Sequence, residues 1–222
     1  MKIKVEARLA FPVLFEPEQF QGTGDYSYSC SLLVGESPRV KVLQGVEAEN
    51  GKLIYSKKIA LDDAVEQVGK EKWGAKWPAV KKTMEKKDLS CLHDGDLKEK
   101  FAGFAGQWYL SCRSSEGARP KVVDQRGNPV TQRDGVVYAG CYVIALLEIW
   151  AQDNGYGQRV NAQIRGVQFL RNGDAFGGGE GPCQVLGCGQ LDGVTAGVVP
   201  AGHGLTVVST QARHTRYATP PA

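Results

Sequence analysis

The chain has 222 residues, 42% of them hydrophobic and 23% charged, which is the composition of a globular protein with a substantial core. Its formal net charge is only +3 at pH 7, so a nucleic-acid ligand would have to be held by a local basic surface and not by an overall basic excess. No apolar run approaches the ~20 residues that span a bilayer, and six cysteines without a CxxC pair indicate reduced thiols in a cytoplasm.

The N-terminal quarter is expected to be β structure. The first six residues form a strand pattern, not a signal peptide, and they open a first strand over residues 2–15. A second strand follows over residues 26–34, and residues 52–55 show further β character after a turn at Asn50-Gly51. The 28 glycines of the chain favour short strands and many turns.

Two helices are expected next. Apolar residues recur at helical spacing from Ala60 to Trp73, and Gly74 can end this helix. A second helix begins at Trp77-Pro78 and runs to about Lys87, because proline suits the first turn of a helix. Together they predict a helical insertion at about residues 60–87.

The rest of the chain is expected to be mainly β. One strand covers Gln107–Arg113, and two longer ones, Cys141–Ala151 and Arg159–Leu170, flank a turn-rich stretch. Five or more strands with one helical insertion predict a mainly β, five-stranded OB-fold barrel over residues 1–180. We expect residues 181–222 to be a Gly-rich, irregular extension with one strand at Leu205–Ser209 and a frayed tail.

Several short motifs occur in an order that is typical of one protein family. They are Leu14-Phe15-Glu16-Pro17, Tyr28-Ser29-Cys30-Ser31, Leu92-His93-Asp94-Gly95-Asp96, Arg119-Pro120-Lys121-Val122-Val123-Asp124, Tyr138-Ala139-Gly140-Cys141-Tyr142-Val143, Val167-Gln168-Phe169-Leu170-Arg171, and Gly173-Asp174 with Gly177-Gly178. Through them, over roughly residues 1 to 180, the chain resembles a family of tailed-phage single-stranded DNA-binding proteins, distant relatives of the single-strand binders of podovirus replication systems. The resemblance implies an OB-fold that coats single-stranded DNA without sequence preference or cofactor, during phage replication, recombination or repair in the cytoplasm of the infected bacterium.

The C-terminus departs from what the resemblance implies. Many single-strand binders end in an acidic tail that recruits partners, whereas this chain ends in a basic stretch containing Arg213 and Arg216. Phage or host replication proteins therefore remain candidate partners without a recognised docking segment. No membrane association is expected, and the sequence leaves the oligomeric state open.

Binding single strands without reading sequence requires cations for the backbone and aromatic rings for the bases. Because side chains alternate along a strand, Tyr109 and Arg113 are expected to face outward, opposite Trp108, Leu110 and Cys112. By the same alternation, Arg159, Asn161, Gln163 and Arg165 share the outer face of a later strand. The full set of candidate DNA-binding residues is Tyr109, Arg113, Arg119, Lys121, Trp150, Tyr156, Arg159, Asn161, Arg165 and Phe169.

Each candidate also has a purely structural interpretation. Trp150 and Phe169 are large aromatic residues of the kind that is usually buried, so a position in the core is the competing expectation. Arg159 and Arg165 could simply solvate an outer barrel face. Tyr109 has polar neighbours on its strand, which favours exposure of its ring.

Three other functions are compatible with parts of the sequence. Cys91, His93 and Cys112, or the Cys183/Cys188 pair, supply zinc-ligand types, although their spacing matches no standard finger. The His93-Asp94-Gly95-Asp96 stretch, with Glu148 and Asp153, could hold a divalent ion in a nuclease. A non-enzymatic phage structural or assembly protein would have a similar all-β composition. We expect no catalytic residue, no metal site and no cofactor.

Overall fold

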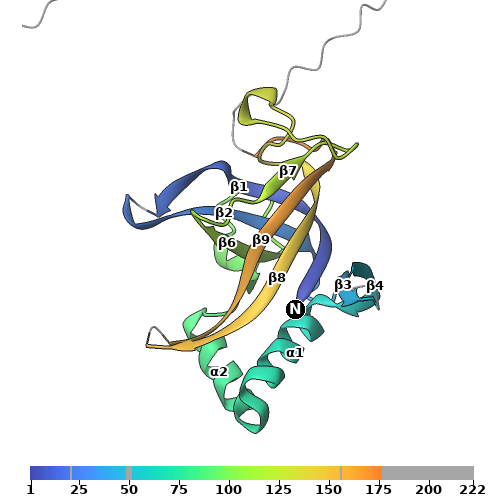
Figure 1. Cartoon of the computed structure of the whole chain (residues 1–222). Coiled ribbons are helices and arrows are strands. Elements are labelled where there is room, and N and C mark those ends of the chain that lie inside the picture. The colour runs from blue at the N-terminus through green and yellow to red at the C-terminus, as the bar shows by residue number, and fades with distance from the viewer. Residues whose placement is uncertain (21, 49–51, 156, 177–222) are drawn as a thin grey trace, which may run out of the picture. The chain divides into compact units, whose positions relative to one another are not determined.

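The computed structural model describes residues 1–20, 22–48, 52–155 and 157–176, which are mainly β structure (Figure 1). By its contacts the chain divides into residues 1–184 and 185–222. The strands are β1 (Lys2–Phe20), β2 (Thr23–Gly35), β3 (Lys41–Glu47), β4 (Leu53–Ala60), β5 (Leu92–Asp94), β6 (Trp108–Ser115), β7 (Lys121–Val123), β8 (Tyr142–Asn154) and β9 (Gly157–Arg171). The helices are α1 (Leu61–Trp73) and α2 (Trp77–Lys87), with short 3-10 turns η1 (Gly74–Lys76), η2 (Gly95–Lys98) and η3 (Gln132–Asp134). The predicted extension 181–222 and the turn at Asn50-Gly51 lie outside the described residues.

Five strands close a ring. They follow the order β2-β6-β9-β8-β1, and β1 pairs with β2 as well. Neighbours are antiparallel except β6 and β9, which run parallel and meet at a single residue pair, Cys112 and Ala162. The predicted five-stranded OB-fold is therefore confirmed as a ring of five strands, although one narrow junction keeps it from being a clean barrel. Four further strands extend it: β3 and β4 from β1, β5 from β6, and β7 from β9.

Strand β1 closes the ring because it is long enough to serve two neighbours. Within the ring, residues 2–8 pair with β8, and pairs with β2 occur from Arg8 to Phe20. Ile3, Val5, Ala7 and Leu9 alternate into the core and are at most 4% exposed. The strand extends past the predicted end at residue 15, and its pairing with β2 shifts register between Ala10 and Val13.

The hairpin formed by β8 and β9 confirms the predicted pattern most fully. The two strands pair antiparallel from the Tyr142–Arg171 pair to the Asn154–Gly157 pair. Along β9, Val160, Ala162 and Ile164 are buried, while the residues between them face outward. The alternation of apolar and polar side chains therefore sets which face of the hairpin is available to a ligand.

The two predicted helices are present within a residue of their expected bounds and lie beside the β8–β9 hairpin (Figure 1). Their junction is held by the rings of Trp73 and Trp77, which stack 5.5 Å apart. A Cβ at Gly69 would come within 2.4 Å of the Trp77 ring, so this helix position requires glycine. Trp73 also donates from Nε1 to Asp153 Oδ2 at 2.7 Å, which ties α1 to the tip of the hairpin. No helix in the described part is long and apolar enough to cross a membrane.

Candidate nucleic-acid interface

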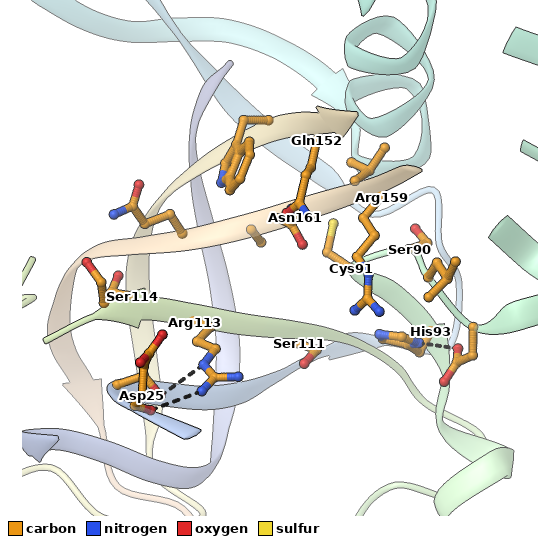
Figure 2. Close-up of a pocket in the computed structure, with 18 of the residues that line it drawn as sticks. Asp25, Ser90, Cys91, His93, Ser111, Arg113, Ser114, Gln152, Arg159 and Asn161 are labelled. Atoms are coloured by element: carbon orange, nitrogen blue, oxygen red, sulfur yellow. Dashed lines mark hydrogen bonds and ion pairs between the residues drawn. The ribbon is translucent and has the colours of Figure 1, made fainter. Parts of the chain in front are cut away.

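A groove of about 990 Å³ runs along the junction of β6 and β9 (Figure 2). Its walls come from the beginning of β2, the segment that follows α2, and strands β5, β6, β8 and β9. The groove exists because β6 and β9 share only one residue pair, so their exposed ends diverge. Ser114 of β6 holds the junction from below by donating from Oγ to the backbone oxygen of Ile164 at 2.6 Å.

Three basic side chains line the groove. Arg113 donates from Nε to Ser27 Oγ at 2.9 Å and from Nη2 to the backbone oxygen of Asp25 at 3.5 Å, so its guanidinium is held in place. Arg159 extends from β9 toward the side of the groove that carries His93 (Figure 2), and no hydrogen bond or ion pair joins it to another described residue. The third is Lys98.

The groove is only weakly basic. Two carboxylates, Asp25 and Asp88, lie among the same lining residues as the three cations. Most of the remaining polar lining is neutral and can donate or accept hydrogen bonds. These neutral residues are Ser27, Ser90, Ser111, Ser114, Ser115, Gln152, Asn161 and Gln163. Such a surface can hold a phosphodiester backbone by many short contacts with a modest electrostatic contribution.

Two aromatic side chains are exposed in the groove. Trp150 of β8 is 42% exposed and Tyr26 of β2 is 49% exposed. Trp150 lies opposite Asn161 of β9 in the strand register, next to the Gln152–Arg159 pair. Its exposure contradicts the expectation that it belongs to the core. The groove thus combines π surfaces with cations and neutral donors.

The expectation that Tyr109 faces outward is wrong. Its ring is 3% exposed, because β5 pairs with this end of β6 and places His93 directly opposite Tyr109. The His93 ring stacks on it at 4.9 Å, Phe104 contacts it edge-on at 5.1 Å, and Lys98 Nζ lies 4.6 Å from its centroid. Burial raises the pKa of Tyr109 to about 12, and the nearby charge of Asp88 adds to this effect. Tyr109 belongs to the floor of the groove and supports it.

The residues weighed as metal ligands have other partners. His93 Nδ1 lies 2.6 Å from Asp88 Oδ1, and the Asp94 side chain accepts from the backbone N–H of Asp96 at 3.0 Å. Burial raises the pKa of the Cys91 thiol to about 12, which disfavours the thiolate that a zinc ligand must provide. Within the described ranges, no three His, Cys, Asp or Glu side chains gather to hold a metal ion. Cys183 and Cys188 lie outside those ranges.

Four of the predicted site residues do not line the groove. Arg165 is exposed on β9 but is engaged by Glu148, whose Oε2 accepts from Nε at 2.9 Å and from Nη2 at 2.5 Å. Phe169 is half-buried and packs against the core. Arg119 and Lys121 are exposed in and after the β6–β7 loop, away from the groove lining. Tyr156 lies outside the described residues.

The structure therefore brings together part of the predicted set and adds residues that sequence reasoning missed. The predicted residues Tyr109, Arg113, Trp150, Arg159 and Asn161 all line the groove. The main additions are Tyr26 and Lys98, together with the serines. Lys98 had no signal in the sequence, because it ends a short 3-10 turn in a stretch where charged residues are common. Tyr26 could have been found from its polar surroundings at the beginning of β2.

The sequence of the chain matches one known family over most of its length. Residues 1–187 match the family described as "Enterobacter phage Enc34, ssDNA-binding protein". The chain belongs to this family. The resemblance seen in the sequence motifs is thereby confirmed. The chain is also similar to the putative protein p50 of Acyrthosiphon pisum secondary endosymbiont phage 1. The two are 40% identical over 182 residues, which cover 81% of this chain and 88% of p50.

Solved structures of the Enc34 protein share the fold. The single-stranded DNA-binding protein from bacteriophage Enc34 in complex with ssDNA is 22% identical, with a TM-score of 0.54 over 79% of this chain and 89% of that one. Another structure of the Enc34 protein is 23% identical, with a TM-score of 0.51 over 80% and 85% of the two chains. At these identities the likeness establishes that the ring of strands is the family fold.

Proposed function

We propose that this chain binds single-stranded DNA independently of sequence, along the groove at the junction of β6 and β9. The observation that carries the proposal is the 42% exposure of Trp150 in a groove that also holds Arg159 without a described partner. An exposed indole, together with a guanidinium that no other described residue engages, can stack a base while the cation contacts its phosphate. Membership of the Enc34 family supports the same conclusion.

In this proposal, different residues of the groove contact the bases and the phosphates of the strand. Trp150 and Tyr26 stack bases, and every base has a π face, so this contact does not read sequence. Arg159, Arg113 and Lys98 contact phosphates, while the neutral hydroxyl and amide groups add hydrogen bonds to the backbone or to base edges. The protein holds the strand unpaired and needs no catalytic residue, metal or cofactor for this.

The biological setting follows from the family. A phage protein that coats and protects single strands would act in the cytoplasm of the infected bacterium during replication, recombination or repair. Phage or host replication proteins are then the natural partners. The basic C-terminal stretch around Arg213 and Arg216 gives no acidic docking segment for them.

Titration with oligo-dT and with a duplex of the same length, at low and moderate salt, tests the proposal. We expect salt-sensitive binding to the single strand alone, with quenching of tryptophan fluorescence because Trp150 is in contact with the bases. EDTA should leave this binding unchanged. Equal weak binding to both forms, or none, would refute the proposal and favour the phage assembly protein.

A further inference from the structure

The exposed aromatic residues of this chain extend beyond the groove. Strand β1 makes a bulge at Phe11, where one extra residue separates the pairs Ala10–Ser31 and Val13–Ser29. Phe11 has a φ of +48°, which a bulky side chain rarely adopts, and its ring is 48% exposed. Bulges commonly serve to aim a side chain, and strain of this kind concentrates at binding sites.

The Phe11 ring is part of an aromatic cluster. Its centroid lies 5.2 Å from Phe101, with the two rings nearly perpendicular, and 5.6 Å from Phe104. Phe101 is 38% exposed, whereas Phe104 is buried beneath both. The cluster therefore has a rigid base and an exposed upper surface made by two rings.

This cluster is joined to the floor of the groove through buried rings. Phe104 contacts Tyr109 edge-on at 5.1 Å, and Tyr109 lies in the groove floor. Lys98, which lines the groove, has its Nζ 5.8 Å from the Phe104 ring centroid and 4.6 Å from that of Tyr109. Lys100 lies 5.4 Å from the Phe101 ring. One aromatic residue, Phe104, thus separates the two exposed rings from Tyr109 in the groove floor. Lys98 and Lys100 lie close to the rings of this cluster.

Resting on the proposed function, we propose that Phe11 and Phe101 form a second stacking platform, which takes bases of the same DNA strand where it leaves the groove past Lys98. The lysines would hold the phosphates that accompany those bases. The chemistry favours nucleic acid over an apolar protein surface, because cations flank the rings. The described part of the chain exposes four large aromatic residues, of which Trp150 and Tyr26 line the groove and Phe11 and Phe101 form this cluster.

The test uses variants that remove one ring while the fold is kept. Phe11→Gly suits the positive φ and so relieves strain, and Phe101→Ala removes a ring that is already partly exposed. Phe101→Tyr retains the ring, and Leu97→Ala removes a 73% exposed aliphatic side chain from the same segment. The affinity of each for labelled oligo-dT is measured over lengths from about 4 to about 16 nucleotides, the range of site sizes for one OB-fold.

We expect Phe11→Gly and Phe101→Ala to bind the shortest oligonucleotides like the wild type and the longest ones roughly 5- to 150-fold more weakly, since that is the contribution of one stacked base. Phe101→Tyr and Leu97→Ala should match the wild type at every length. Equal affinity of all variants at all lengths would overturn the proposal, as would a loss that is the same at every length, which indicates a supporting role beneath Tyr109. Lower self-association with unchanged DNA affinity would assign the rings to contacts between copies. Failure of the wild type to bind any oligonucleotide would instead refute the proposed function itself.

Discussion

Replacement of Arg159 by alanine gives a quantitative test of the groove. Arg159 is one of three basic residues that line it, with Lys98 and Arg113. Each phosphate neutralised on a single strand contributes about −0.7 to the slope of log K against log salt, so three cations predict a slope of about −2. The affinity of the wild type should then fall roughly 20-fold between about 50 and about 200 mM salt, and that of Arg159→Ala roughly 7-fold.

The assay is fluorescence anisotropy of a labelled oligo-dT just long enough to fill the groove, at four or more salt concentrations. Arg165→Ala is the matched control, because Arg165 lies on the same face of the same strand but is engaged by Glu148 and does not line the groove. The exposed Arg165–Glu148 pair contributes at most about 1 kcal/mol to stability, so this variant should stay folded.

A salt slope for Arg159→Ala equal to that of the wild type would show that this arginine contacts no phosphate. Equal decreases in slope for Arg159→Ala and Arg165→Ala would show that the DNA follows the outer face of β9 and not the groove. Either result would refute the assignment of the groove as the binding site.

Three further predictions follow from the groove and its supports. Trp150→Ala should weaken oligo-dT binding by about 1–3 kcal/mol, and the variant should still unfold cooperatively because Trp150 is 42% exposed; unchanged affinity would remove it from the site. Because burial raises the pKa of Tyr109 to about 12 from an ordinary value of 10, the folded protein should lose stability as the pH rises between these values. Urea denaturation should show a smaller loss for Tyr109→Phe, and parallel curves would contradict this. Hydrogen bonds from Trp73, and to a smaller extent from Gln158, lower the pKa of Asp153 below its ordinary value of 3.8. The ionised Asp153 therefore stabilises the folded protein fully above pH 3.8, and this contribution is lost as the pH falls below that value. The difference in unfolding free energy between Trp73→Phe and the wild type should therefore shrink in acid, and a constant difference would contradict the Asp153 link.

The sequence predicted the parts of the fold that depend on local periodicity. The alternation along β9 and the apolar spacing of α1 both appear as expected, because burial on one face leaves its period in the sequence. Strand β3 was not predicted, and the reason is that its residues, Lys41–Glu47, lack a clear alternation. No pattern in the sequence predicted the order of the strands in the ring.

The candidate site was harder to predict, because exposure depends on what packs across the strand. Tyr109 lies on the side of β6 that the alternation of side chains predicts to face outward. It is nevertheless buried, because β5 pairs with β6 and places His93 over it. Arg159 and Arg165 are equivalent in the sequence, yet Arg165 is engaged by Glu148, which pairs with Gln163 in the β8–β9 register, whereas Arg159 lines the groove. Such distinctions require the pairing of strands, which a single sequence does not contain.

The hydrogen bond between Trp73 and Asp153 changes how the helical insertion should be regarded. An insertion between two strands is ordinarily the part of a domain that can be shortened, replaced or allowed to diverge at little cost. Here it braces the end of the hairpin whose next residues, Gln152 and Arg159, form a wall of the groove. A shortened domain made by trimming the helices would keep the residues of β6, β8 and β9 that line the groove and would lose the hydrogen bond that braces the hairpin carrying Gln152 and Arg159.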